Sequence, residues 1–194
     1  DLVRSRGLGD VYKRQRLDGA EIATATKREF HPVRKRIQVV FQDPYRSLNA
    51  RIRVGDSIVE GMRNFGVPEA EARARAVELL DIVGLGADTM ERYPHQFSGG
   101  QRQRICIARA LALRPDILIA DEAVSALDVS VQAQVLNLLQ DLQRDLGLTM
   151  LFVAHDLAVV DYLCDEVVVM YLGRVMERGP TSEVYARPRH PYTL

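Results

Sequence analysis

The sequence has no excess of either charge and very little cysteine. Lys+Arg and Asp+Glu each number 26 among 194 residues, so no net field exists to hold a polyanion such as DNA, and we expect no nucleic-acid partner. Any bound anion must be held by a local group of residues. The two cysteines, Cys106 and Cys164, stand in apolar stretches without CxxC spacing or a nearby histidine cluster. They indicate buried thiols in a cytoplasmic protein without structural metal.

Long apolar runs are missing as well. The most apolar segment, residues 105–120, is interrupted by Arg109 and Arg114. No run reaches the 18 residues that are typical of a membrane-spanning helix. The sequence therefore predicts a chain that does not cross a membrane by itself.

The chain does contain short β-rich runs that alternate with helical ones after residue 15. This alternation predicts an α/β fold around a largely parallel sheet. The continuous apolar character of the runs is typical of strands that are buried on both faces. The longest helix should begin after Asp128 and stop at Gly147, because apolar residues recur at helical spacing between them. The expected strands are 37–41, 117–121, 149–154, 166–171 and 174–178.

Residues 50–97 differ from the rest, because they carry helical patterns and no convincing strand. Two Glu/Arg pairs lie four residues apart with the acid first, which is the favoured order on an exposed helix face. We interpret this segment as a helical subdomain, inserted into a core formed by 16–49 and 98–194. The two pairs are Glu69/Arg73 and Glu71/Arg75.

One motif, Ser98-Gly99-Gly100-Gln101, stands at the expected start of a helix. A helix that begins at Ser98 presents unpaired backbone N–H groups and the positive end of its dipole. The two glycines let a ligand come close to this end. The motif therefore predicts one half of an anion-binding site.

Polar side chains follow three of the expected strands. Asp121 and Glu122 end one strand, His155 follows a second and Gln42 follows a third. Ligands of open α/β sheets bind at this end of the strands. A carboxylate can hold hydrated Mg²⁺ or activate a water, histidine can bond a phosphate, and glutamine can reach a metal ion and a water. Each residue alone would more often belong to an ordinary loop, but four of them together indicate a site.

Five motifs stand in the order found in the ATP-binding subunits of ABC transporters, and residues 16–194 resemble that family. In the family these motifs are the Q-loop, the signature, the Walker B strand, the D-loop and the switch-histidine loop. The runs 42–49, 125–139 and RHPYT near the end are similar to the ATPases of oligopeptide and dipeptide importers. The five motifs are FQDPYRSLN at 41–49, FSGGQRQR at 97–104, ILIADE at 117–122, SALD at 125–128 and VAHD at 153–156.

The resemblance implies ATP and Mg²⁺ as cofactors and gives roles to the residues at the strand ends. Glu122 would polarise the hydrolytic water, and His155 would contact the γ-phosphate. Asp121 would serve Mg²⁺. Gln42 would sense Mg²⁺ and couple the site to a membrane subunit.

The resemblance also implies partners. Ser98, Gly99, Gly100 and Gln101 would cap the ATP of a second ABC ATPase subunit, in a homo- or heterodimer, and Asp128 would reach across that interface. Transmembrane permease subunits would hold the protein at the cytoplasmic face of the cell membrane, and a solute-binding protein would be an indirect partner. Candidates for the groove that receives the permease are Tyr45, Leu48 and Phe65, and the alternative for each of them is an ordinary core residue.

The implied fold is an incomplete P-loop NTPase (RecA-type) core with a parallel sheet, plus an all-helical ABC signature subdomain. The family holds the triphosphate in a loop that ends in Gly-Lys-Ser/Thr. None of the 13 glycines here is followed by lysine. We interpret residues 1–15 as a non-native leader on a truncated chain; the alternative is a genuine but degenerate family member with a disordered basic leader. We expect weak or absent ATP binding, no ATPase activity of the chain alone, and an exposed apolar face on its sheet.

Two other classes of function compete with transport. A non-catalytic module that supplies Ser98 to another subunit's ATP would suit an intact signature without a phosphate loop, but Glu122 would then have no purpose. DNA-repair ATPases with a similar ATP head are disfavoured, because a short helical insert and no long heptad repeat separates the Q-loop from the signature. We interpret the full-length parent as an ATPase that drives uptake of oligopeptides, dipeptides or a related solute.

Overall fold

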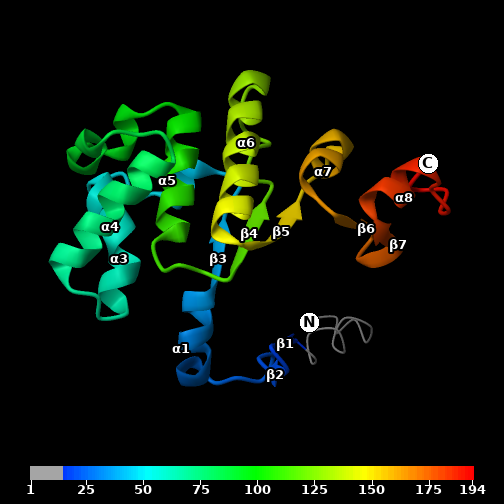
Figure 1. Ribbon diagram of the computed structural model, residues 1–194, viewed down its shortest axis with the longest axis horizontal. Helices are drawn as coiled ribbons and strands as arrows, with labels where there is room; N and C mark the ends of the chain where they lie inside the picture. The colour runs from blue at the N-terminus through cyan, green and yellow to red at the C-terminus, as the bar shows by residue number, and fades with distance from the viewer. Residues whose placement is uncertain (1–14) are drawn as a thin grey trace, which may run out of the picture.

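Three parallel strands form the central sheet of the computed structural model, which describes residues 15–194 (Figure 1). Their order is β3-β4-β5, and Val40 pairs with Ala120, which pairs with Phe152. The expected α/β fold with a parallel sheet is confirmed. The expected leader lies outside the described residues except for Gln15. The strands are β3 (Ile37–Val40), β4 (Ile117–Asp121) and β5 (Thr149–Val153).

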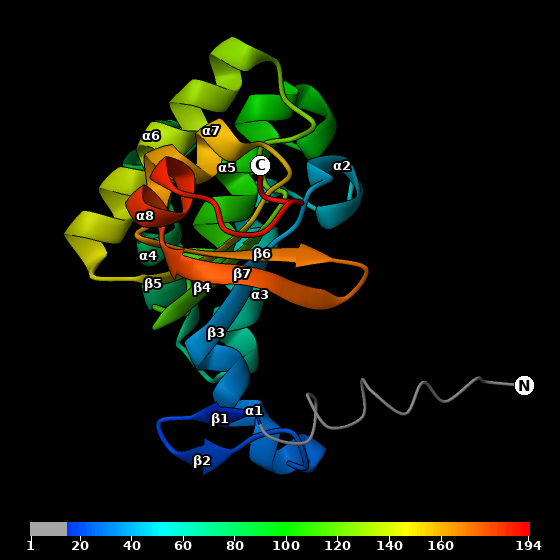
Figure 2. The ribbon, with the colours of Figure 1, turned by 90° about the vertical axis from the view of Figure 1, so that its right-hand side faces the viewer.

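The remaining strands form two separate antiparallel hairpins and do not join this sheet. The expected strands at 166–171 and 174–178 are present as β6 (Glu166–Tyr171) and β7 (Arg174–Pro180), but they pair with each other and not with the parallel sheet. Leu172 and Gly173 both have positive φ and close the two-residue hairpin turn between them. The hairpin lies beside α8 in Figure 2. The second hairpin joins β1 (Arg16–Leu17) to β2 (Ala20–Glu21).

Helices connect the parallel strands and make up the segment between β3 and β4. The segment 50–97 contains no strand, as expected. Among the described residues, none of the helices is long and apolar enough to cross a membrane. The helices are α1 (Lys27–Arg36), α2 (Pro44–Ser47), α3 (Val54–Asn64), α4 (Glu69–Ile82), α5 (Gly99–Leu111), α6 (Val129–Leu146), α7 (Leu157–Leu163) and α8 (Thr181–Ala186), with 3-10 turns at Ala87–Glu91 and Pro94–Gln96.

Helix α6 begins and ends where its sequence predicts. The Asp128 carboxylate accepts a hydrogen bond of 3.0 Å from the Val131 N–H and so caps the first turn. Gly147 follows the last turn with φ of 63°, a left-handed conformation that glycine adopts without a steric penalty. The side chain at Asp128 is therefore engaged in capping its own helix.

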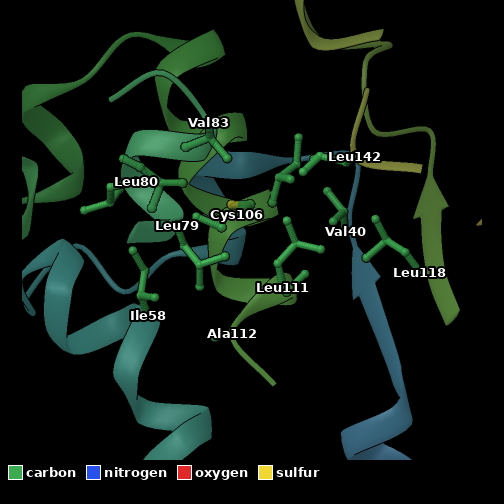
Figure 3. Close-up of a cluster of buried hydrophobic side chains, with 14 of the residues drawn as sticks. Val40, Ile58, Leu79, Leu80, Val83, Cys106, Leu111, Ala112, Leu118 and Leu142 are labelled. Carbon is green, nitrogen blue, oxygen red and sulfur yellow. The ribbon is translucent and has the colours of Figure 1, made fainter. Parts of the chain in front are cut away.

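The hydrophobic core runs without a break from the helical subdomain to one face of the sheet. Helix α5 lies between the two: it packs against α3 and α4 on one side and against β3 and α6 on the other (Figure 3). Burial of this apolar surface is the main favourable term in folding. The labelled members of the cluster are Val40, Ile58, Leu79, Leu80, Val83, Cys106, Leu111, Ala112, Leu118 and Leu142.

The opposite face of the sheet is left open. Leu118 and Ala120 are fully buried on the packed face, whereas Leu151 is 56% exposed and Val153 is 43% exposed on the other. The expectation that all the strands are buried on both faces is therefore wrong for β5. The expectation of an exposed apolar sheet face is confirmed for the residues that the structure describes.

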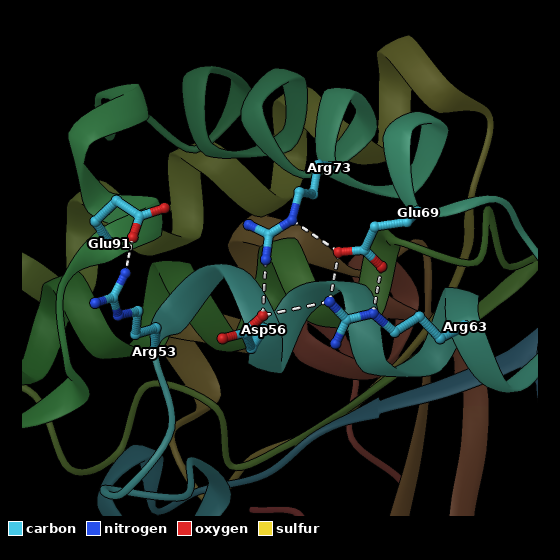
Figure 4. A network of polar contacts seen from close by, with 6 residues as sticks. All are labelled: Arg53, Asp56, Arg63, Glu69, Arg73 and Glu91. Atoms are coloured by element: carbon cyan, nitrogen blue, oxygen red, sulfur yellow. Dashed lines mark hydrogen bonds and ion pairs between the residues drawn. The ribbon is translucent and has the colours of Figure 1, made fainter.

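Four charged side chains join α3 to α4 on the outside of the subdomain (Figure 4). The Arg63 guanidinium donates two hydrogen bonds, of 2.5 and 2.6 Å, to the Glu69 carboxylate. Arg73 donates to the same carboxylate at 2.7 Å and to Asp56 at 3.0 Å. The expected Glu69/Arg73 pair is thus present. The expected Glu71/Arg75 pair is not formed in the described structure, because Arg75 pairs with Glu78 instead.

This network predicts an acid dependence that is specific to Glu69. The hydrogen bonds from Arg63, and then those from Arg73, lower the pKa of Glu69 from 4.5 to about 2. The stabilisation is present above pH 4.5 and is lost as the pH falls toward 2. Glu69→Gln should therefore flatten the fall in melting temperature across this interval, and added salt should shrink the difference because the group is exposed.

Circular dichroism melts at a series of pH values measure this effect. Glu71→Gln is the matched control, since within the described part of the chain Glu71 makes no ion pair. Equal acid dependence of the two variants would contradict the role assigned to the network.

Candidate functional site

The carboxyl ends of the three parallel strands bring the expected residues together at one edge of the sheet. Asp121 is the last residue of β4 and pairs with Val153 in β5, so Glu122 and His155 follow neighbouring strands. The Glu122 Oε2 and His155 Nδ1 atoms lie 3.8 Å apart. Gln42 follows β3 at the same edge.

The Glu122 backbone is held in an unusual conformation. Its φ is 47°, in the left-handed region that non-glycine residues rarely adopt, and its N–H donates to the Val153 carbonyl at 2.9 Å. Strain of this kind persists only where the surrounding structure imposes it, and it is common at functional sites. The turn thereby directs the Glu122 side chain toward the end of β5.

A serine that the site prediction omitted connects this carboxylate to Gln42. The Gln42 Nε2 donates to the Ser125 Oγ at 3.1 Å, and the Ser125 hydroxyl donates to the Glu122 carbonyl at 3.0 Å. The Ser125 Oγ also lies 3.5 Å from the Glu122 Oε2. The only signal in the sequence is the three-residue spacing from Glu122 to Ser125 within one turn. Ser125 therefore links two of the expected residues.

The hollow between these residues is small. A pocket of about 80 Å³ is lined by Glu122, Ser125, His155 and neighbouring residues of β5 and α6. Pockets that enclose a drug-sized ligand usually measure about 300–1,000 Å³. The pocket between these residues is therefore too small to enclose a ligand of that size. A larger hollow of about 860 Å³ lies beside β7 and α8, and no expected site residue lines it.

The oxygen atoms of the side chains at the carboxyl edge of the sheet suit a hard cation. Mg²⁺ is bound by one or two protein oxygens together with waters and substrate phosphates. Asp121 offers an exposed carboxylate and Gln42 an amide oxygen. Among residues 15–194 there is no cluster of three or more His, Cys, Asp or Glu side chains that would hold a metal without such help. The residues present fit Mg²⁺ that arrives with a phosphate ligand.

The glycine-rich motif forms a second group, which is separate from the first. Ser98 caps α5: its Oγ accepts from the Gln101 N–H at 3.3 Å, and the Gln101 Oε1 accepts from the Ser98 N–H at 3.0 Å. Within the described structure no hydrogen bond or ion pair joins this turn to Glu122 or His155. Among the described residues, the two groups of expected residues are therefore not joined by a polar interaction.

Helices α5 and α6 touch at their first turns. A Cβ atom placed on Gly99 would lie 3.7 Å from Leu127, which is ordinary contact, whereas one on Gly100 would lie 2.2 Å from the Val131 Cγ1. Gly100 is buried at this contact. Its missing side chain is what allows the N-terminus of α5 to approach α6, next to Asp128.

The three candidates for a permease-binding groove lie in different environments. Leu48 is buried in the core and Phe65 is partly buried against it, so for Leu48 the structure favours the alternative of an ordinary core residue. Tyr45 is 61% exposed. Its ring stacks under the Arg102 guanidinium at 3.9 Å from the ring centroid.

The sheet and the residues at its carboxyl edge have the α/β arrangement of P-loop NTPases. Within that class the chain belongs to the ABC transporter family: the family model described as "ABC transporter" matches residues 9–125.

Known proteins with this fold lie close in sequence and structure. The chain is 58% identical over 177 residues to a protein of Brucella ovis named as a peptide import ATP-binding protein, which covers 91% of this chain. It is 53% identical over 193 residues, or 99% of its length, to the glutathione import ATP-binding protein GsiA of Escherichia coli O6:H1. It spans 56% of the Brucella protein and 30% of GsiA.

One solved structure has a similar fold. CbiO1 from Clostridium perfringens, part of the ABC transporter complex cbiONQ, is 33% identical and has a TM-score of 0.80. The likeness covers 89% of this chain and 68% of that one.

The close contact at Gly100 predicts different effects for two adjacent glycines. Gly100→Ala should lower the free energy of unfolding by about 1–3 kcal/mol, because the new methyl group overpacks against Val131. Gly99→Ala, the matched control, should change it by about 0.5 kcal/mol or less. Urea unfolding measures both. Equal effects of the two substitutions would contradict this packing role.

Proposed function

We propose that the chain is part of the ATP-binding subunit of an ABC importer, which couples ATP hydrolysis to uptake of oligopeptides, dipeptides or a related small solute such as glutathione. The observation that carries the proposal is the joining of Gln42, Ser125, Glu122 and His155 at the carboxyl edge of the sheet. The names of the Brucella and Escherichia relatives support the solute class.

In this proposal each residue at the strand ends has one task. Glu122 orients an attacking water and accepts its proton, which its position next to an open pocket permits. His155 donates a hydrogen bond to the terminal phosphate. Asp121 and Gln42 hold Mg²⁺, which when bound offsets negative charge on the phosphates. Ser125 keeps the Gln42 amide beside Glu122.

The glycine-rich motif at the start of α5 contacts a partner subunit in this proposal. The N–H groups at the start of α5, with Ser98 as the cap and the short turn through Gln101, face ATP that is held by a second ATPase subunit. Asp128 lies at the adjacent first turn of α6 and faces the same interface. Permease subunits bind the assembly at the cytoplasmic face of the membrane, and a solute-binding protein delivers the solute to them.

A non-catalytic module is the second candidate. Its support is the intact cap at Ser98 in a sequence without a Gly-Lys-Ser/Thr loop. Such a chain would complete the ATP site of a partner and hydrolyse nothing itself. Glu122 argues against it, because a carboxylate placed within 3.8 Å of His155 by a strained turn would have no purpose in such a module.

A chimaera tests the proposal. The chain alone should bind MgATP weakly, because the loop that supplies N–H groups and a lysine to the phosphates is absent from the sequence. In the chimaera, the segment of a complete family member that contains the Gly-Lys-Ser/Thr loop is placed before Arg16. This should tighten MgATP binding at least about a hundredfold in calorimetric titration. Glu122→Gln in the chimaera should then lower kcat about 100-fold or more while ATP affinity is retained.

Glu183→Gln on α8 is the matched control and should leave kcat unchanged. Undiminished hydrolysis by the Glu122→Gln chimaera would contradict the catalytic role. If the chimaera binds ATP without hydrolysing it, and the chain stimulates a complete subunit only while Ser98 is intact, the non-catalytic module is the correct function.

A further inference from the structure

One face of α5 holds the segment between β3 and α3. Residues spaced three, four and seven apart share a helix face, and here the face is Gly99, Arg102, Gln103, Cys106 and Arg109. It lies against residues 41–48, with α2 packed on α5. This segment contains Gln42, which the proposed function places at the nucleotide site.

Two arginines on this face of α5 contact α2, which is the part of the segment that follows Gln42. The Arg109 Nη1 donates to the Ser47 carbonyl at 2.5 Å. The Arg102 guanidinium lies 3.9 Å from the centroid of the Tyr45 ring, within the range of a cation–π contact. Both contacts hold α2 against α5.

The contact nearest to Gln42 has a different character. The Gln103 side chain is fully buried, with 0% exposure. Its Nε2 donates to the Phe41 carbonyl at 3.4 Å, and its Oε1 has no hydrogen-bond partner in the described structure. A buried polar atom without a partner is costly, so this side chain is a poor choice for stability alone.

The Phe41 carbonyl belongs to the peptide group that leads directly into Gln42. The orientation of this peptide sets where the Gln42 side chain points, and Gln42 donates to Ser125 beside Glu122. Gln103 lies in the second turn of this helix, which is capped by Ser98. Helix α5 therefore carries the glycine-rich motif and, through Gln103, contacts the peptide group that precedes Gln42.

We infer that Gln103 is a positioning residue, which holds the Phe41–Gln42 peptide on α5 and so sets the direction of the Gln42 side chain. The consequence for ATP hydrolysis rests on the proposed function, but the positioning itself is a property of this chain. An ordinary core side chain at this position would only fill space.

Gln103→Met distinguishes a positioning role of Gln103 from a space-filling one, because methionine has a similar length and shape but no polar amide. Removing the unpartnered Oε1 should leave the melting temperature equal or higher. Amide hydrogens of residues 42–48 should nevertheless exchange about two- to tenfold faster, because the bond to the Phe41 carbonyl is lost. Hydrogen exchange by mass spectrometry, without nucleotide, measures this in the native chain and the variant.

Gln140→Met on the exposed side of α6 is the matched control and should leave exchange in residues 42–48 unchanged. Arg109→Met provides a second measurement, with faster exchange expected near Ser47. Unchanged exchange in Gln103→Met would overturn the inference. So would faster exchange throughout the chain with a lower melting temperature, which is the result of a merely structural role. Because no ATP is used, failure of the proposed function does not affect this test.

Discussion

The parallel register of β3, β4 and β5 is the constraint on which the site depends. Parallel strands end at one edge, so residues far apart in the sequence meet there: Asp121 pairs with Val153, and Glu122 comes within 3.8 Å of His155. A shift of one residue would turn these side chains to the other face of the sheet. Burial of Leu118 and Ala120 on the packed face holds the register in place.

Helix α5 is the second organising element, since it packs against both the helical subdomain and the parallel sheet. Its buried residues close the core between the helical subdomain and the sheet (Figure 3). Its first turn meets α6 at Gly100 and Val131. One helix therefore packs against the segment that contains Gln42 and also begins at Ser98, so it connects the two parts of the proposed site.

Local patterns predicted the strands of the parallel sheet and both ends of α6, where Asp128 and Gly147 act through nearest neighbours. The convergence of strand ends followed from their being parallel. Ser125 was missed, because its link to Gln42 joins residues 83 positions apart and no local pattern encodes it. The two strands β6 and β7 were predicted, but not their pairing in a sheet of their own, because an apolar run indicates a strand and does not identify its partner.

The most direct test of this account is paramagnetic relaxation by MnATP, in which Mn²⁺ replaces Mg²⁺ and broadens the NMR signals of nearby amides. The method reports weakly bound nucleotide, so it suits the chain as it stands. The account predicts broadening that is concentrated at Gln42, Asp121, Glu122 and His155. Broadening that is concentrated at the helical subdomain instead would contradict the claim that the carboxyl edge of the sheet is a nucleotide site.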